Sequence, residues 1–185
     1  MPAPARAAQQ GGDVEHQPTS HRYAGVRRTK DPPRPAGLGM REFLRRVETA
    51  ALVTLPPDLA RAVTSRVRFS LLQLHFGDPT VHYEVWVQRP RGGQMGSGAG
   101  VEVGLHFEGR DGQRNRALLA FMVGRAAELV GALGPGIEPE EWTPAWTRLH
   151  ERLPLEGPLD AALAEALGRR LARWATVCQP ILAAR

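Results

Sequence analysis

Two strictly alternating stretches place the strongest constraint on the fold. The first, "VHYEVWVQ", runs from Val81 to Gln88, and the second, "VEVGLHFEG", runs from Val101 to Gly109. Successive side chains of a strand point to opposite faces of its sheet, so a period of two residues is typical of a strand. In both stretches one set of alternate positions is apolar, and the other set carries mostly histidine, glutamate, tryptophan or glutamine. We therefore predict two strands with an apolar face against the core and a polar face opposite it.

Residues 89–100 join these strands and include five glycines, which is typical of a hairpin connection. Because like faces must oppose each other, residue numbers paired across this hairpin sum to an even value, 190 or 188. The first register places Glu84 opposite His106, and the second places His82 opposite His106. Directly opposed Cβ atoms lie about 4.5–5.5 Å apart, so either register brings these three side chains together.

Four other segments have apolar residues at the spacing of a helix. Asp111 and Gly134 are suited to cap the start and the end of the longest one before Pro135. The predicted helices cover residues 40–54, 58–65, 111–134 and 158–180.

Two further segments fit more than one element. Residues 66–76 alternate like a strand but also continue an apolar helical stripe, and the "GDPT" turn after them favours a strand. Residues 146–154 also alternate, which favours a further strand. Thr143 as N-cap before Pro144 would instead start a short helix.

Strands grouped together, with helices before and after them, indicate an α+β fold. We expect an antiparallel sheet of three to four strands with the helices packed on one face, in a single domain over residues 40–185. Residues 1–39 are rich in proline, glycine and alanine and carry few large apolar side chains, so we expect a disordered tail. Met40 opens the first helical pattern directly, and a start of the biological chain at Met40 is an alternative.

The chain has a net charge of +5, but residues 40–185 carry 18 basic and 16 acidic side chains and are nearly neutral. Cys178 is the only cysteine, which excludes an intramolecular disulfide and a cysteine-rich zinc site. No apolar run approaches the roughly 20 residues of a membrane span. We therefore expect a cytoplasmic protein that does not enter a membrane.

From about Val101 to the end, the order of elements resembles one uncharacterised bacterial family. The resemblance rests on "VEVGLHFEG" before a long helix, a segment with "EW" at Gly136–Trp142, the arginine-bearing "TRLHERL", and a terminal helix with a "PIL" tail. Members of that family often follow nuclease-like domains in defence or restriction-type proteins. The resemblance implies a bacterial protein with an accessory role beside nucleic acid.

The residues themselves favour a non-catalytic interaction or accessory module. No GxSxG, HExxH or DxD pattern occurs and Lys30 is the only lysine, so we predict no catalytic residue and no cofactor. Trp86 on the polar face would expose a large apolar area unless a partner covers it, and aromatic residues are common interface anchors. We expect a protein partner or a second copy of the chain to bind the polar face, at His82, Glu84, Trp86, His106 and Glu108.

Two alternative functions, metal-dependent catalysis and nucleic-acid binding, would use other residues or other chemistry. His82, Glu84 and His106 offer two imidazoles and a carboxylate, the set that a metal-dependent enzyme would need. A basic patch would instead bind nucleic acid through phosphate contacts. The arginines predicted for that patch are Arg148, Arg152, Arg169, Arg170 and Arg173.

If the polar face pairs with a second copy, light scattering should give twice the mass of one chain. The substitution Trp86→Ala should reduce that mass to a monomer, because it removes the apolar anchor. The mass of a single chain for both proteins would contradict self-association.

Overall fold

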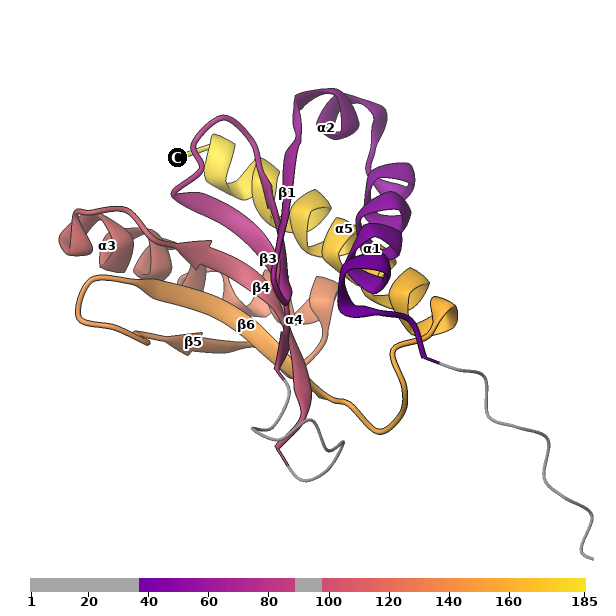
Figure 1. The fold of residues 1–185 in the computed structure, drawn as a ribbon. Coiled ribbons are helices and arrows are strands. Elements are labelled where there is room, and N and C mark those ends of the chain that lie inside the picture. The colour runs from indigo at the N-terminus through magenta and orange to yellow at the C-terminus, as the bar shows by residue number, and fades with distance from the viewer. Residues whose placement is uncertain (1–36, 89–97) are drawn as a thin grey trace, which may run out of the picture. The chain divides into compact units, whose positions relative to one another are not determined.

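The computed structural model describes residues 37–88 and 98–185 (Figure 1). The helices are α1 (Met40–Thr54), α2 (Pro57–Ala62), α3 (Gly112–Val123), α4 (Ala126–Leu133) and α5 (Ala161–Ala183). The strands are β1 (Thr64–Arg68), β2 (Leu71–His75), β3 (Val81–Gln88), β4 (Gly100–Phe107), β5 (Glu138–Glu140) and β6 (Thr147–Pro154). Residues 1–36 of the predicted tail and most of the glycine-rich connection lie outside the described residues, and the backbone N–H of Leu38 donates a hydrogen bond to Leu159.

The α+β prediction is confirmed, but the sheet has six strands rather than three to four. Their order is β1-β2-β3-β4-β6-β5, and every neighbouring pair is antiparallel. One extra strand arises because residues 66–76 fold as a hairpin, with Phe69 and Ser70 between β1 and β2. The other is β5, whose three residues are too few to show an alternating pattern. The strand interpretation of residues 146–154 is confirmed by β6.

The β3–β4 hairpin adopts the second of the two registers, in which His82 pairs with His106 and Val85 with Val103. β6 pairs with the other side of β4, so that His106 pairs with Arg148. These two pairings place β4 at the centre of the polar and apolar faces alike.

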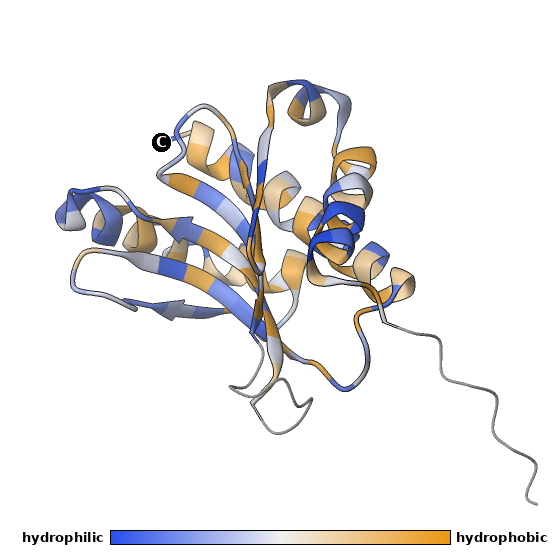
Figure 2. Ribbon diagram, in the orientation of Figure 1, coloured by the Kyte–Doolittle hydropathy of each residue, from blue (hydrophilic) through white to orange (hydrophobic). Residues whose placement is uncertain are grey.

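The helices α1, α3 and α5 cover the apolar face of the sheet. α5 packs against β3 and β4, α1 against α5 and the β1–β2 hairpin, and α3 against β6 and β4 (Figure 1). Figure 2 shows apolar and polar residues alternating along the central strands. Tyr83, Val103 and Leu105 from the strands and Trp174 from α5 are fully buried in the core between these layers. No helix in the described ranges is long and apolar enough to cross a bilayer.

The single helix predicted over residues 111–134 is wrong, because α3 and α4 divide that segment. Asp111 caps α3 as predicted, and its carboxylate accepts hydrogen bonds from the backbone of Gln113 and Arg114. The break falls at Gly124, whose backbone freedom weakens a helix interior.

The terminal helix α5 starts after Asp160, whose side chain accepts a hydrogen bond from the backbone of Leu163. It continues past Pro180 to Ala183, whereas the prediction ended it at that proline. A proline so close to the end of a helix disturbs only the last turn, and Pro180 itself is exposed.

Gly168 allows α5 to approach α1 closely. A Cβ atom at this position would lie 2.5 Å from the Cβ of Ala50 and 2.6 Å from the carbonyl oxygen of Val47. Such separations are well below van der Waals contact, so a larger residue must push the two helices apart.

We expect Gly168→Ala to lower the free energy of unfolding by about 1–3 kcal/mol, which is typical of overpacking. The matched control is Gly131→Ala in α4, where an added Cβ meets no atom within 4 Å. Because alanine is the better helix former, the control should gain up to about 1 kcal/mol. Urea unfolding followed by circular dichroism measures both, and equal effects would contradict the close packing of α1 on α5.

Candidate metal centre

The polar face of the sheet is buried at β3, β4 and β6, although none of the helices α1, α3 and α5 packs on it. His82 is 2% exposed, His106 is 1% exposed and Glu102 is 1% exposed. Ionisable groups taken out of water are stable only when they have charge or hydrogen-bond partners. We call these buried side chains and their partners the polar cluster. Its members are Gln73, His82, Glu84, Glu102, His106, Glu108, Glu140, Trp142, Arg148 and His150.

The register of the sheet builds this cluster from parallel rows of side chains. One row crosses five strands through His75, His82, His106, Arg148 and Glu140. The next row runs through Gln73, Glu84, Gly104, His150 and Glu138. A Cβ at Gly104 would lie 2.5 Å from the carbonyl oxygen of Leu149, so only glycine permits this close approach of β4 and β6.

His82 has one ring nitrogen fixed and the other turned into the cluster. Its Nδ1 lies 3.0 Å from the carbonyl oxygen of Pro79, which can only accept a hydrogen bond, so Nδ1 carries the proton. Nε2 is then the acceptor, and it lies 3.0 Å from the side-chain nitrogen of Gln73. The same nitrogen of Gln73 donates to Glu84 at 3.0 Å. Gln73 therefore links His82 Nε2 to the carboxylate of Glu84.

His106 stacks on His82, with 5.4 Å between the ring centroids. Its Nδ1 lies 3.3 Å from Oε1 of Glu108, and its Nε2 lies 3.4 Å from Oε1 of Glu102. Burial alone would lower the pKa of His106. The neighbouring carboxylates, Glu102 first, outweigh burial and raise the pKa to about 9. Without a metal ion, His106 therefore holds a proton between two carboxylates.

Three ligand atoms of the cluster converge on one point. One atom each from His82, His106 and Glu108 lies within 4.8 Å of the others. Bond lengths of about 2.0–2.1 Å around a tetrahedral zinc ion correspond to about 3.3 Å between ligand atoms. The separation is 3.3 Å from His106 Nδ1 to Glu108 Oε1 and 4.0 Å from His82 Nε2 to the same oxygen. Small side-chain movements would close the set around an ion.

Glu84 lies beside this group without belonging to it, since its Oε2 lies 3.5 Å from His82 Nε2. Burial raises the pKa of Glu84, but His82, His106 and Gln73 outweigh burial and lower it. Glu84 is thus a carboxylate at neutral pH and is available as a fourth ligand.

A second layer of charged side chains surrounds His106. Arg148 forms ion pairs with both Glu102 and Glu140, and the guanidinium lies 5.0 Å above the ring of Trp142. His150 lies 3.4 Å from Glu102 and 3.2 Å from Glu140. Burial raises the pKa of Glu102, but the histidines and Arg148 outweigh burial and lower it to about 2.

Four side-chain nitrogens are buried without a hydrogen bond from the described residues. Three lie in the polar cluster, namely His106 Nε2, Trp142 Nε1 and His150 Nδ1, and the fourth is His75 Nδ1 beside it. The two histidine nitrogens of the cluster reach Glu102 only as ion-pair contacts of 3.4 Å. Buried polar groups are nearly always satisfied in folded proteins, so exceptions clustered together point to a functional site.

Four of the five residues predicted on the polar face are brought together in the cluster, and Trp86 lies at its edge. Trp86 pairs with Leu71 on one side and Glu102 on the other, and it is half-buried. Sequence reasoning missed Glu102, Arg148 and His150 as cluster members. The alternation in "TRLHERL" was the available signal, since it puts Arg148 and His150 on the same face of β6.

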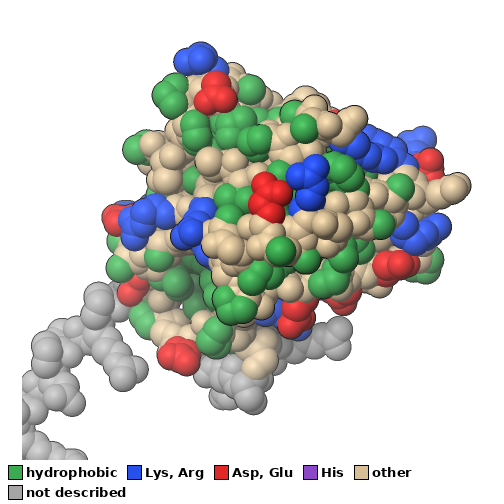
Figure 3. All heavy atoms as spheres, turned by 180° about the vertical axis from the view of Figure 1, so that it is seen from behind, with side chains coloured by type: hydrophobic (Ala, Val, Ile, Leu, Met, Phe, Trp, Pro, Cys, Tyr) green, Lys and Arg blue, Asp and Glu red, His purple; other side chains and the backbone are tan. Residues whose placement is uncertain are grey.

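The arginines predicted to bind nucleic acid do not share one free surface. Arg148 is buried in the cluster, Arg170 pairs with the buried Glu151, and Arg169 lies 3.7 Å from Glu165. Figure 3 shows basic side chains in separated groups on one side of the molecule, with acidic side chains beside several of them. Nucleic-acid binding by these residues stays a prediction that their placement does not support.

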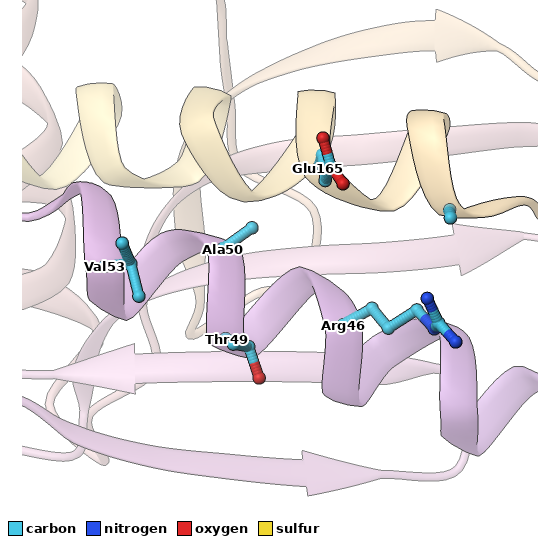
Figure 4. Close-up of a pocket in the computed structure, with 6 residues that line it drawn as sticks. Arg46, Thr49, Ala50, Val53 and Glu165 are labelled. Atoms are coloured by element: carbon cyan, nitrogen blue, oxygen red, sulfur yellow. The ribbon is translucent and has the colours of Figure 1, made fainter.

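A shallow groove of about 340 Å³ between α1 and α5 is a separate feature (Figure 4). Its two charged residues are neutralised within their own helices, since Arg46 pairs with Glu42 and Glu165 with Arg169. Val53 and Ala50 give the groove an apolar wall. It lacks the convergent ionisable groups of the polar cluster.

Comparison with known proteins gives no match to a family model, a curated protein or a solved structure. The resemblance to a bacterial family over residues 101–185 therefore stays a prediction. Function has to be argued from the site itself.

We expect Glu102→Ala to destabilise the metal-free protein by about 3–5 kcal/mol, as is typical when one partner of a buried ion pair is removed. The matched control is Glu42→Ala, which breaks the exposed pair with Arg46 and should cost less than about 1 kcal/mol. Urea unfolding in EDTA measures both free energies. A cost for Glu102→Ala no larger than that of the control would show that the cluster does not depend on this carboxylate.

Proposed function

We propose that this chain binds a divalent transition-metal ion of the zinc class on its polar sheet face. The ligands are His82 Nε2, His106 Nδ1 and Glu108, with Glu84 as the fourth. The proposal is carried by the convergence of buried histidine and carboxylate ligand atoms within 4.8 Å.

The chemistry of the donors selects the class of ion. Neutral imidazole nitrogen and carboxylate oxygen suit zinc, cobalt, nickel and ferrous iron. Calcium and magnesium prefer sites built from oxygen alone, which the stacked His82 and His106 do not provide. The carboxylates of Glu84, Glu102, Glu108 and Glu140 also outnumber Arg148, and this excess of negative charge favours a cation.

The surroundings of the two histidines support the same proposal. Ligating histidines usually donate their second ring N–H to a carboxylate or a backbone carbonyl, which fixes the tautomer and the ring orientation. His82 does so through Nδ1 to Pro79. With a metal on its Nδ1, His106 would carry its proton on Nε2, which faces Glu102.

Burial favours a structural metal over a catalytic one. The side chains of His82 and His106 are 3% and 2% exposed, and Glu108, at 19%, is the most open of the three ligands. Structural zinc sites are closed, whereas catalytic sites keep one position open to substrate. The ion would tie β3, β4 and the residue that follows β4 together, in keeping with a non-catalytic role for the chain.

The test is titration of protein stripped with EDTA by Zn²⁺ and Co²⁺, followed by calorimetry and by the visible absorption of bound Co²⁺. We expect one ion per chain and a higher melting temperature with zinc, because the ion binds only the folded state. His82→Ala, His106→Ala and Glu108→Ala should each weaken binding at least about tenfold.

His75→Ala is the matched control, because His75 lies in the same row beside His82 but outside the ligand set. It should bind Co²⁺ as the wild type does. Binding that survives His106→Ala, or the absence of any binding to the wild type, would refute the proposed site. Circular dichroism of each variant excludes unfolding as the cause of a loss.

A further inference from the structure

The turn between β1 and β2 combines an exposed aromatic residue with an unfavourable backbone. Phe69 is 93% exposed, and its φ of 45° is the only positive value among the non-glycine residues that the structure describes. Bulky residues are disfavoured in this left-handed region, and two-residue hairpin turns prefer asparagine or glycine there. Phe69 therefore stabilises neither the turn nor the core.

Strained positions of this kind persist where function requires them. Single exposed apolar residues are common on protein surfaces. Phe69 differs in combining the highest exposure of the large apolar residues that the structure describes with an unfavourable backbone. Aromatic side chains commonly anchor protein interfaces.

The strand next to this turn is the outer strand of the sheet (Figure 1). In the part of the chain that the structure describes, β1 pairs only with β2, so its outer edge offers backbone N–H and C=O groups. Such an edge can accept an added strand from another chain.

The exposed side chains of β1 give this edge a positive charge. Thr64, Arg66 and Arg68 are exposed and share one side, while Ser65 and Val67 face the side of α1 and are half-buried. Within the described residues neither arginine forms an ion pair, and nor does the exposed Arg61 at the end of α2.

The positive charge of the β1 edge favours an acidic partner over a second copy of the chain. A second copy pairing antiparallel about Arg66 would place that arginine opposite its own copy, and like charges directly opposite each other are destabilising. Edge arginines alone would be explained as protection against unwanted strand pairing. Protection against strand pairing does not explain Phe69. An exposed phenylalanine beside edge arginines fits a partner that brings negative charge to the edge.

We infer that β1 and Phe69 form a docking edge for an extended acidic segment of another protein. The segment would add a strand beside β1, with acidic residues at alternate positions against Arg66 and Arg68. Its intervening residues would be apolar, because they fall on the side of Val67 and α1. Phe69 would anchor one end of the added strand. Arg66 lies on the same sheet face as the polar cluster, next to Gln73, but no residue of this docking edge is a proposed ligand of the metal.

The test uses a display library of random 12-residue peptides, panned against the wild-type protein. Selected peptides should alternate acidic with aliphatic residues. A synthetic peptide of the consensus sequence should bind the wild type at least tenfold more tightly than Phe69→Asn and than the double variant Arg66→Glu/Arg68→Glu. Hydrogen exchange should slow at the backbone of residues 64–68 when the peptide is bound.

Two controls keep a loss of binding from being an effect of unfolding. Asparagine tolerates a positive φ, so Phe69→Asn should melt at a higher temperature than the wild type. Val53→Asn removes another exposed apolar side chain, 82% exposed on α1, and should leave peptide binding unchanged. Selection of no acidic peptide, or equal binding to the wild type and Phe69→Asn, would overturn the inference.

Discussion

The pairing of β3 with β4 is the interaction on which the rest of the structure depends. It joins eight residues of each strand in one register, which sends Tyr83, Val85, Val103 and Leu105 to one face. The helices α1, α3 and α5 pack on that face. The same register sends His82 and His106 to the other face, directly opposite each other. A slip by one residue would exchange the two faces, so one register fixes both the core and the polar cluster.

Burial of the polar cluster is costly, and the structure offsets that cost with charge. Three imidazoles and several carboxylates lie in a region where His82, His106 and Glu102 are almost inaccessible to water. Arg148 lies between Glu102 and Glu140, and the carboxylates of Glu102 and Glu108 stabilise the protonated form of His106. An apolar surface would be simpler to fold, since a buried ionic network is weak support for stability. The proposed cation would give this network a role that stability alone does not explain.

Much of the fold could be predicted from local pattern, because strict alternation identifies β3, β4 and β6 and periodic apolar residues identify the helices. The hairpin of β1 and β2 could not, because Phe69 occupies a turn position with a positive φ, where glycine or asparagine is usual. For the site, the even sum of paired residue numbers in the hairpin predicted that His82, Glu84 and His106 lie together. It did not predict that this face is buried. Burial depends on partners distant in sequence, such as Trp142, whose ring centroid lies 6.3 Å from that of His106, and no local period reveals them.

The centre and the edge of the same sheet carry opposite charge and opposite exposure. At β3 and β4 the polar side chains are buried and carboxylates predominate, which suits a small cation that needs no large opening. At β1 the side chains are exposed and arginines predominate, which suits an acidic segment that can pair with a free backbone edge. A metal tying β3 to β4 would stiffen the strands behind β2 without contacting β1. The hairpin would then hold Phe69 and the arginines on a rigid support, and a preorganised edge loses less conformational entropy when it binds a partner.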